Sequence, residues 1–319
     1  MAQDGPKVAD AVMDHPIHRL LPPALWPYAQ LARWERPIGW WLLLWPCWWS
    51  LAMALDVTRL RPAEALWAFP LMLVGAVAMR GAGCTWNDIA DTDLDAQVTR
   101  TASRPIPAGR VRRSAAFAFL VAQALAGFAV LLSLASLRGH FDWYVVGLGL
   151  ASLVVVAAYP FAKRVTDWPQ LVLGLAFSWG AFMGWAVVFG TLDAAPVALY
   201  AGAIVWTIGY DTIYAHQDRE DDALIGVRST ARLFGRRSHA AIAILYAGAI
   251  GFFALAFALA GVGAVAYLGL VAAALHLTWQ VRALDIDDPD RCLALFRSNT
   301  QVGWLILGGL AADVALRLA

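Results

Sequence analysis

Long apolar runs dominate this sequence and limit what the chain can fold into. Several of them reach the roughly 20 residues that an α-helix needs to cross the hydrocarbon core of a bilayer. Hydrophobic residues make up 61% of the chain and charged residues 15%, and the mean hydropathy is +0.61. Soluble domains carry more charge, about 25% of their residues. The sequence therefore predicts an all-α, polytopic membrane protein.

We expect nine transmembrane helices, separated by loops that alternate between long or basic and short. Residues 1–23 are polar and lack the basic and apolar regions of a signal peptide, so we expect a disordered cytoplasmic tail there. The remaining residues, 24–319, are expected to form one transmembrane domain. The expected spans run over residues 38–56, 66–88, 114–137, 143–160, 169–189, 195–216, 239–260, 262–281 and 299–317.

The distribution of lysine and arginine predicts the orientation. Most of these residues lie in the N-terminal segment and in the loops after the second, fourth, sixth and eighth spans. Positively charged loops face the cytoplasm, so we expect a cytoplasmic N-terminus and a C-terminus on the opposite side of a bacterial-type inner membrane. Tryptophans along the first span, including Trp45 and Trp49, are expected at the membrane interface or against lipid.

Charge and cysteine content exclude several classes of function. The net charge of +1 and the scattered basic residues argue against a nucleic-acid partner. The three cysteines form no C-x-x-C pair and the six histidines are dispersed, so neither a disulfide framework nor a zinc site is expected. Composition thus predicts the lipid bilayer as the partner of this chain.

Acidic residues gather at the end of the second expected span, in the stretch WNDIADTDLDAQVTRTASRPIPAG over residues 86–109. On a helix that turns about 100° per residue, Asn87, Asp91 and Asp95 share one face. Three oxygen ligands on one face suit a hard divalent cation, which also relieves the repulsion between neighbouring carboxylates. A solvated helix end is the alternative, but Asp is costly near a bilayer and commonly marks a functional site. We call residues 87–95 the first acidic motif.

A second acidic cluster follows the sixth expected span, in the stretch YDTIYAHQDREDDALIGVRST over residues 210–230. By the same helical geometry, Asp211, Asp218 and Asp222 share one face, and we call them the second acidic motif. We expect two helices, each ending in an acidic stripe, to face each other across a central cavity that opens to the cytoplasmic side.

Basic residues accompany both motifs and point to a phosphate ligand. They are Arg100, Arg104, Lys163 and Arg228. Mg²⁺ commonly bridges carboxylates and substrate phosphates, and basic residues can clamp the remaining oxygens. A diphosphate at an apolar cavity implies a polyprenyl diphosphate, whose leaving group would be neutralised by metal and cations as the allylic C–O bond breaks.

These patterns resemble those of the UbiA superfamily of intramembrane aromatic prenyltransferases, and within it the 4-hydroxybenzoate polyprenyltransferases of ubiquinone biosynthesis. The stretches RPIGWWLLLWPCWWSLA (36–52) and YPFAKRVTDWPQLVLGLAFSWG (159–180) are similar to the 4-hydroxybenzoate branch. The family patterns N-D-x-x-D-x-x-x-D, R-T-x-x-R-P, Y-x-x-x-K and Y-D-T-x-Y-A followed by D-x-x-x-D are all present. They fall on Asn87, Asp88, Asp91 and Asp95; Arg100, Thr101, Arg104 and Pro105; Tyr159 and Lys163; and Tyr210, Asp211, Thr212, Tyr214, Ala215, Asp218 and Asp222.

The resemblance implies a reaction and a set of roles. The family folds as nine transmembrane helices around a central cavity, binds Mg²⁺, here expected as two ions, and joins a polyprenyl chain to the ring carbon ortho to the phenol of 4-hydroxybenzoate. The metal ligands would be Asn87, Asp91, Asp95, Asp218 and Asp222. The catalytic residues would be Asp91, Asp218, Arg100 and Lys163. The substrate-binding residues would be Arg36 for the carboxylate of the acceptor, and Arg100, Arg104, Tyr159, Lys163 and Arg228 for the diphosphate, with Asp88 and Asp211 orienting the ligands.

Alternatives remain open from the sequence. A transporter could move cations along paired Asp residues, although both motifs lie on one side of the membrane and, apart from Arg80, no ionisable residue inside a span continues a path. Another aromatic acceptor, such as homogentisate or a haem vinyl group, would use the same chemistry. The loop arginines also fit a positive-inside flank, and Lys163 could simply snorkel toward the membrane surface.

Overall fold

The structure, a computed structural model, describes residues 17–58, 66–97, 101–219 and 226–318. Within this described part the chain forms helices joined by turns and irregular segments, and no strand occurs. The first 16 residues of the predicted tail lie outside it. The chain divides into two compact units: the first unit comprises residues 1–40 and 73–130, and the second comprises residues 41–72 and 131–319.

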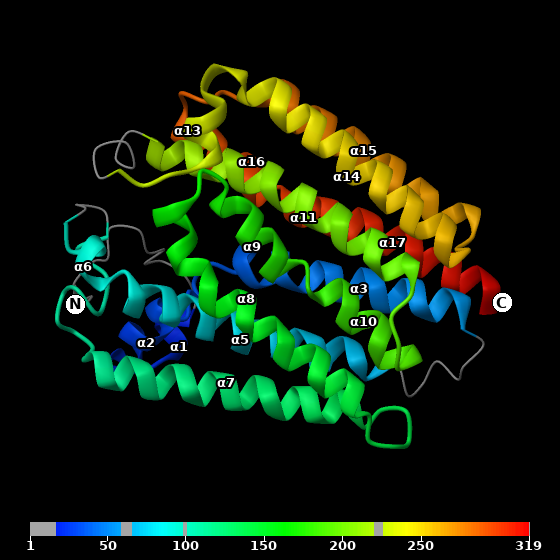
Figure 1. The fold of residues 1–319 in the computed structure, drawn as a ribbon, viewed down its shortest axis with the longest axis horizontal. Coiled ribbons are helices and arrows are strands. Elements are labelled where there is room, and N and C mark those ends of the chain that lie inside the picture. Colours follow the sequence, from blue (N-terminus) through cyan, green and yellow to red (C-terminus); the bar gives the residue numbers. More distant parts are fainter. Residues whose placement is uncertain (1–16, 59–65, 98–100, 220–225, 319) are drawn as a thin grey trace. The chain divides into compact units, whose positions relative to one another are not determined.

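The first unit combines the short helices at the start of the described chain with parts of two long helices (Figure 1). Leu31 is buried together with Ile106 and Ala116, and the rings of Tyr28 and Phe119 meet edge to face at 5.2 Å. This small core ties the N-terminal helices to the segment that follows the first acidic motif. The helices are α1 (Ile17–Leu20), η1 (Pro23–Leu25), α2 (Trp26–Leu31), α5 (Ala68–Ala90), α6 (Thr92–Asp95) and α7 (Arg113–Ala135).

The second unit is a bundle of long helices. Figure 1 shows α14 lying along α11 and α15 lying along α17, and both pairs are in direct contact. Its helices are α3 (Ile38–Val57), α8 (Trp143–Val165), α9 (Pro169–Phe177), α10 (Gly180–Phe189), α11 (Ala194–Ala215), η2 (His216–Asp218), α13 (Thr230–Phe234), η3 (Gly235–Arg237), α14 (Ser238–Ala260), α15 (Ala264–Ala283), α16 (Pro289–Arg297) and α17 (Asn299–Leu318).

Small residues let α10 press directly on α3. A Cβ atom on Gly184 would lie only 2.4 Å from the carbonyl oxygen of Cys47, and one on Gly180 would lie 2.3 Å from the sulfur of the same residue. The Ser50 hydroxyl donates to the carbonyl of Ala181 at 2.5 Å. Glycine is therefore required where the two helix backbones approach each other.

Trp45 and Trp49 of α3 are fully buried in the second unit. Trp45 stacks on Trp41 at 4.8 Å and meets Trp304 edge to face at 4.9 Å, and the Trp49 indole N–H donates to the carbonyl of Gly303 at 3.0 Å. The prediction that these two tryptophans lie at the membrane interface or against lipid is therefore wrong. Composition alone does not separate a lipid-facing tryptophan from one that is enclosed by other helices.

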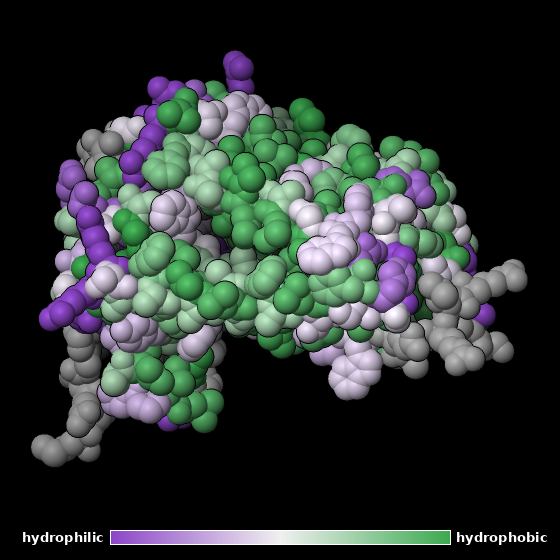
Figure 2. All heavy atoms as spheres, turned by 60° about the horizontal axis from the view of Figure 1, so that its bottom comes forward, coloured by the Kyte–Doolittle hydropathy of each residue, from purple (hydrophilic) through white to green (hydrophobic). Residues whose placement is uncertain are grey.

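Seven helical stretches of the described chain are long and apolar enough to cross a membrane: Ile38–Val57, Ala68–Ala90, Arg113–Ala135, Trp143–Val165, Pro169–Phe189, Thr230–Ala260 and Ala264–Ala283. Two further spans were expected where α11 and α17 lie; these helices have 22 and 20 residues but are not among the seven. Many residues of α11 are buried, so polar groups on it such as Thr207 face protein. Figure 2 shows apolar side chains over much of the visible surface, as lipid-facing helices require. The all-α membrane class is thus confirmed.

Candidate functional site

The first acidic motif lies where α5 ends and α6 begins. α5 ends at Ala90 and α6 begins at Thr92, yet the backbone N–H of Asp91 donates to the carbonyl of Asn87 at 2.9 Å, and that of Asp95 donates to the carbonyl of Asp91 at 2.8 Å. These hydrogen bonds between residues four apart keep the helical register across the junction. The predicted alignment of Asn87, Asp91 and Asp95 on one helical face is confirmed.

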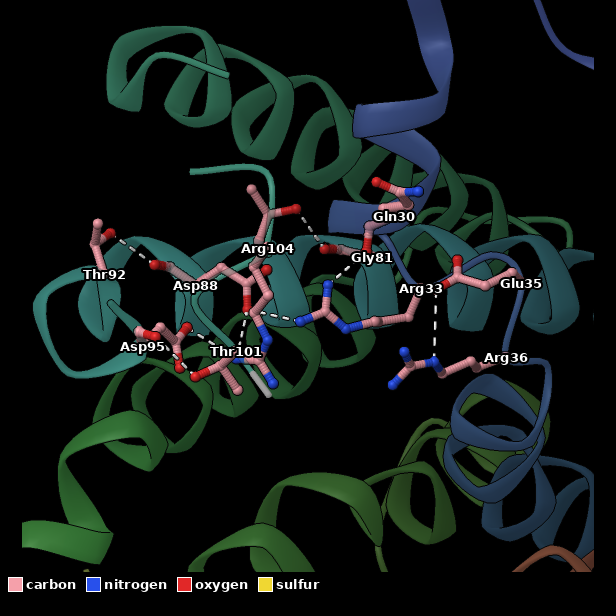
Figure 3. Close-up of polar contacts among 11 residues, drawn as sticks. Gln30, Arg33, Glu35, Arg36, Gly81, Asp88, Thr92, Asp95, Thr101 and Arg104 are labelled. Atoms are coloured by element: carbon pink, nitrogen blue, oxygen red, sulfur yellow. Dashed lines mark hydrogen bonds and ion pairs between the residues drawn. The ribbon is translucent and has the colours of Figure 1, made fainter. Parts of the chain in front are cut away.

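Two arginines converge on Asp88, whose side chain is fully buried (Figure 3). Arg33 donates from Nη2 to Asp88 Oδ1 at 2.8 Å, and Arg104 Nη1 lies 3.4 Å from the same oxygen. Arg104 Nη1 also donates to Asp95 Oδ2 at 2.9 Å. One guanidinium therefore bridges two carboxylates of the motif, and Asp88 anchors both arginines.

The loop after α6 folds back so that Arg104 reaches the motif. The Thr101 hydroxyl donates to the carbonyl of Asp95 at 2.9 Å, and the backbone N–H of Arg104 donates to the carbonyl of Thr101 at 2.9 Å. The R-T-x-x-R-P sequence thus makes a turn that Thr101 secures and from which Arg104 points to the acids. Arg100, predicted to bind the diphosphate, lies outside the described residues.

Arg33 is a site residue that no sequence pattern singles out. Its backbone φ of 56° lies in the left-handed region, which is uncommon for a residue with a side chain. Its guanidinium is held on one side by the carbonyl of Gln30 and on the other by Asp88, 55 positions away in the sequence. Local strain of this kind is often found at functional positions. No spacing rule reaches over such a distance, so the pairing could not be predicted.

Three acidic side chains of the first motif are buried close to one another. Burial raises the pKa of the Asp95 carboxyl above its usual range, the Arg104 guanidinium opposes this rise, and the negative charges of Asp88 and Asp91 add to it. Asp88, Asp91 and Asp95 all lie within this short stretch, and Arg104 pairs with the first and the last of them. Carboxylate oxygens gathered in this way suit a hard divalent cation. In the described part of the chain, however, no three His, Cys, Asp or Glu side chains come together in a group that could hold a metal ion.

Arg36, predicted to bind the carboxylate of the acceptor, lies just before α3. Its Nε is 3.5 Å from Glu35 Oε1, and the Glu35 side chain is almost fully buried. In Figure 3, Arg36 lies apart from the cluster around Asp88. Arg33 and Arg36 therefore contact different acids, although only three positions separate them.

The second acidic motif begins on α11 and runs into a tighter turn. α11 ends at Ala215, and a 3₁₀ turn covers His216–Asp218. Such a turn advances by about 120° per residue instead of about 100°, a change that is small over three residues. The predicted acidic stripe over Asp211, Asp218 and Asp222 therefore stays a prediction. The side chain of Asp218 and all of Asp222 lie outside the described residues.

Asp211 itself is half-buried on α11, next to the fully buried Tyr210. Tyr210 and Tyr214 both pack on Phe296 of α16, with ring centroids 5.8 Å and 4.5 Å apart. The aromatic residues of the Y-D-T-x-Y-A pattern therefore brace the end of α11 against α16.

Tyr159 and Lys163 lie one turn apart near the end of α8, and both are half-buried. The backbone N–H of Arg228 donates to the carbonyl of Lys163 at 3.2 Å, and Arg228 Nη1 donates to the carbonyl of Val165 at 3.2 Å. The structure thus brings together two predicted diphosphate ligands from distant parts of the sequence. The Arg228 guanidinium lies at the negative end of the α8 dipole, where a cation stabilises the helix.

A model of the UbiA prenyltransferase family matches residues 37–306 of this chain. That stretch includes both acidic motifs, the turn that carries Arg104 and the end of α8 with Tyr159 and Lys163. The chain belongs to the UbiA prenyltransferase family. Arg33 and Arg36 lie just before the matched stretch, so of the two arginines that pair with Asp88 only Arg104 falls within it.

Relatives and solved structures agree with this assignment. The 4-hydroxybenzoate polyprenyltransferase of Bos taurus is 44% identical over 290 residues, which are 91% of this chain and 76% of that protein. The Caenorhabditis elegans protein of the same name is 40% identical over 303 residues, 93% of this chain and 81% of its own. The apo structure of a UbiA homolog from Aeropyrum pernix superposes with a TM-score of 0.69 at 27% identity, covering 85% of this chain and 97% of that one.

A second solved structure shares the fold at lower identity. The UbiA homolog from Archaeoglobus fulgidus, solved bound to GPP and Mg²⁺, superposes with a TM-score of 0.62 at 17% identity, covering 91% of this chain and 99% of that one. The helical arrangement of the family is therefore present here.

The expected membrane has to be corrected. The relatives from Bos taurus, Caenorhabditis elegans and Homo sapiens are all named as mitochondrial enzymes, so the prediction of a bacterial-type inner membrane is wrong. The lysine and arginine count indicates which side of a bilayer a loop occupies, and it carries no information on which membrane that is.

Proposed function

We propose that this protein transfers a polyprenyl chain from its diphosphate to 4-hydroxybenzoate. The observation that carries the proposal is the identity of 40% and 44% to 4-hydroxybenzoate polyprenyltransferases, over more than nine-tenths of this chain. The membrane-spanning helices suit the long apolar chain of the donor, the polyprenyl diphosphate. The buried arginines of the first unit suit its diphosphate, and the buried acids suit a metal ion bound to that diphosphate.

In this reaction the allylic C–O bond to the diphosphate breaks, and both electrons leave with the diphosphate. The ring carbon ortho to the phenol then attacks the allylic carbon, a C–C bond forms, and the ring loses one proton. Catalysis of such a step consists mainly of neutralising the leaving group and keeping water from the carbocation. The basic residues would neutralise the leaving group, and the apolar helices would keep water from the carbocation.

We propose that two divalent cations, most simply Mg²⁺, are held by oxygen ligands of both acidic motifs. When bound, they would neutralise the charge that develops on the departing diphosphate. Structures of a UbiA homolog from Archaeoglobus fulgidus have been solved with GPP and Mg²⁺, with DMAPP and Mg²⁺, and with Cd²⁺, which supports this class of metal. The proposed ligands are Asn87, Asp91, Asp95, Asp218 and Asp222, of which Asp91 and Asp218 would also be catalytic.

The remaining site residues are proposed to bind the two substrates. Arg104, held in place by Asp88 and Asp95, would meet the diphosphate, together with the Arg100 and Lys163 that the family pattern predicts. Tyr159, Asp211 and Arg228 would support this group, since Arg228 already contacts the backbone of Lys163. Arg36 would bind the acceptor, 4-hydroxybenzoate, because a guanidinium group pairs well with the single carboxylate of this molecule.

We also propose the finer architecture that the family predicts. In it, α11 and α17 cross the membrane as well, giving nine crossings around a central cavity. Residues 24–319 would then form one catalytic domain, whose cavity opens on the side where the loop lysines and arginines gather.

The direct test is to incubate membranes that contain this protein with 4-hydroxybenzoate and a polyprenyl diphosphate, in Mg²⁺ or in EDTA. We expect the prenylated acid, detected by mass spectrometry, in Mg²⁺ only. Diphosphate release without this product would overturn the choice of acceptor, and the absence of both would overturn the proposed reaction. Membranes with Asp91→Ala are the matched control for background enzymes.

A further inference from the structure

After the second acidic motif the described chain resumes at Gly226 and runs to the start of α13. We call residues 226–230 the anchoring segment. Its Arg228 N–H donates to the carbonyl of Lys163, and its Thr230 N–H donates to Gln170 Oε1 at 3.0 Å. The segment is therefore attached at two points, to the end of α8 and to the first turn of α9, all within the second unit.

A buried chain of hydrogen bonds continues from this segment to α11. The hydroxyls of Thr230 and Thr212 lie 2.6 Å apart, and Thr212 Oγ1 lies 2.6 Å from the carbonyl of Ile208. A hydroxyl has a single proton, and the carbonyl can only accept, so Thr212 donates to Ile208 and Thr230 donates to Thr212. Thr212 and Thr230 are fully buried and Gln170 is 4% exposed, so water does not compete for these contacts.

Two predicted site residues lie beside this series of hydrogen bonds. Thr212 follows Asp211 on α11, and the anchoring segment holds the carbonyl of Lys163 through Arg228. Breaking the chain would leave a buried hydroxyl or amide without its partner, so the surrounding backbone would have to shift. The Thr212–Thr230–Gln170 chain therefore fixes the position of Lys163 relative to Asp211.

We propose that Thr212, Thr230 and Gln170 are positioning residues for the transfer reaction. They touch no substrate; through the N–H of Arg228 they hold the backbone of Lys163 in place relative to α11, and so set the point from which its side chain reaches the diphosphate. The proposal rests on the proposed function, because it takes Lys163 to be a diphosphate ligand. A small misplacement of such a charge weakens binding of the donor and leaves the binding of the aromatic acid unchanged.

The second unit offers a matched pair of variants on one helix. Thr207 and Thr212 are both buried on α11, and each donates its hydroxyl to the carbonyl four residues earlier. In the described part of the chain, only Thr212 also meets Thr230. Thr212→Val should raise the KM for the polyprenyl diphosphate by about tenfold, while the KM for 4-hydroxybenzoate changes by less than about twofold. Thr207→Val should change neither KM.

Two further variants separate positioning from loss of fold. Thr212→Ser keeps the hydroxyl and should restore the donor KM of the wild type. Thr230→Val removes the same contact from the other side and serves where Thr212→Val does not accumulate. The double variant Thr212→Val/Thr230→Val should show no larger rise than either single variant, because both remove one interaction.

The outcomes distinguish this inference from the proposed function. A normal donor KM in Thr212→Val, an equal rise for both substrates, or the same rise in Thr207→Val would overturn the positioning role while the enzyme remained active. A wild-type protein that makes no prenylated acid would instead overturn the proposed function.

Discussion

Replacing Asp88 with Asn tests whether a single carboxylate anchors the two arginines of the first unit. Asn keeps the size of the side chain but removes the charge that Arg33 and Arg104 share at 2.8 Å and 3.4 Å. A charge-assisted hydrogen bond of good length contributes about 1.5–3 kcal/mol, and a longer one contributes less. Removing one partner of a fully buried ion pair costs about 3–5 kcal/mol, which is an upper limit here. The Arg33 and Arg104 side chains remain 12% and 13% exposed, so we expect the free energy of unfolding to fall by about 2–4 kcal/mol.

The same variant should slow the reaction. Without the Asp88 carboxylate, Arg104 loses one of the contacts that orient its guanidinium toward the diphosphate, while its contact to Asp95 remains. If about half of the lost energy acts in the transition state, kcat/KM for the donor falls by roughly 10-fold, since each 1.4 kcal/mol is a factor of ten. The assay is prenyl transfer at varied donor concentration, with thermal inactivation of the solubilised protein measured alongside.

Asp93→Asn is the matched control. Its carboxylate belongs to the same acidic stretch but is 89% exposed and pairs with the exposed Arg113 at 2.6 Å. Exposed ion pairs contribute little to stability, so this variant should behave as the wild type. Wild-type stability and kinetics in Asp88→Asn, or equal losses in both variants, would refute the assignment of Asp88 as an anchor.

Three further predictions concern a proposed metal ligand, the acceptor site and the packing of two helices. Asp91→Ala should abolish turnover while the protein still accumulates in the membrane, because it removes a proposed metal ligand; normal turnover would contradict the metal assignment. Arg36→Ala should raise the KM for 4-hydroxybenzoate more than that for the donor in steady-state assays, and an equal rise would argue against contact with the acceptor. Gly184→Ala would place a Cβ 2.4 Å from the carbonyl oxygen of Cys47 and should destabilise the protein by about 1–3 kcal/mol. A Cβ on Gly251 would meet open space, so Gly251→Ala should not destabilise the protein. Similar thermal inactivation of the two variants would refute the packing argument.

The features that the sequence predicts well are those with a local period. Apolar length identifies the membrane helices, and steps of four place Asn87, Asp91 and Asp95 on one face, because helical register depends only on nearby residues. The end of α11 is harder to predict. The α-helix changes to a 3₁₀ turn after Ala215, and no Gly or Pro in the sequence marks that position.

Long-range contacts are the part of the site that the sequence does not reveal. The Arg33–Asp88 pair joins residues 55 positions apart, and the backbone of Arg33 is left-handed without a glycine to signal it. A juxtamembrane arginine looks the same whether it sets topology or binds an acid. The prediction for Trp45 and Trp49 was wrong for a similar reason, because hydrophobicity does not distinguish burial in protein from contact with lipid.

The position of the new bond tests the central claim most directly. We would give the purified protein a polyprenyl diphosphate, Mg²⁺ and 4-hydroxybenzoate that carries deuterium on both ring carbons ortho to the hydroxyl. Transfer to one of these carbons must expel one deuteron, so the product should retain a single ring deuterium in the mass spectrum, and no product should form in EDTA. A product that keeps both deuterons, or one that forms equally well in EDTA, would contradict metal-dependent prenylation of the ring carbon.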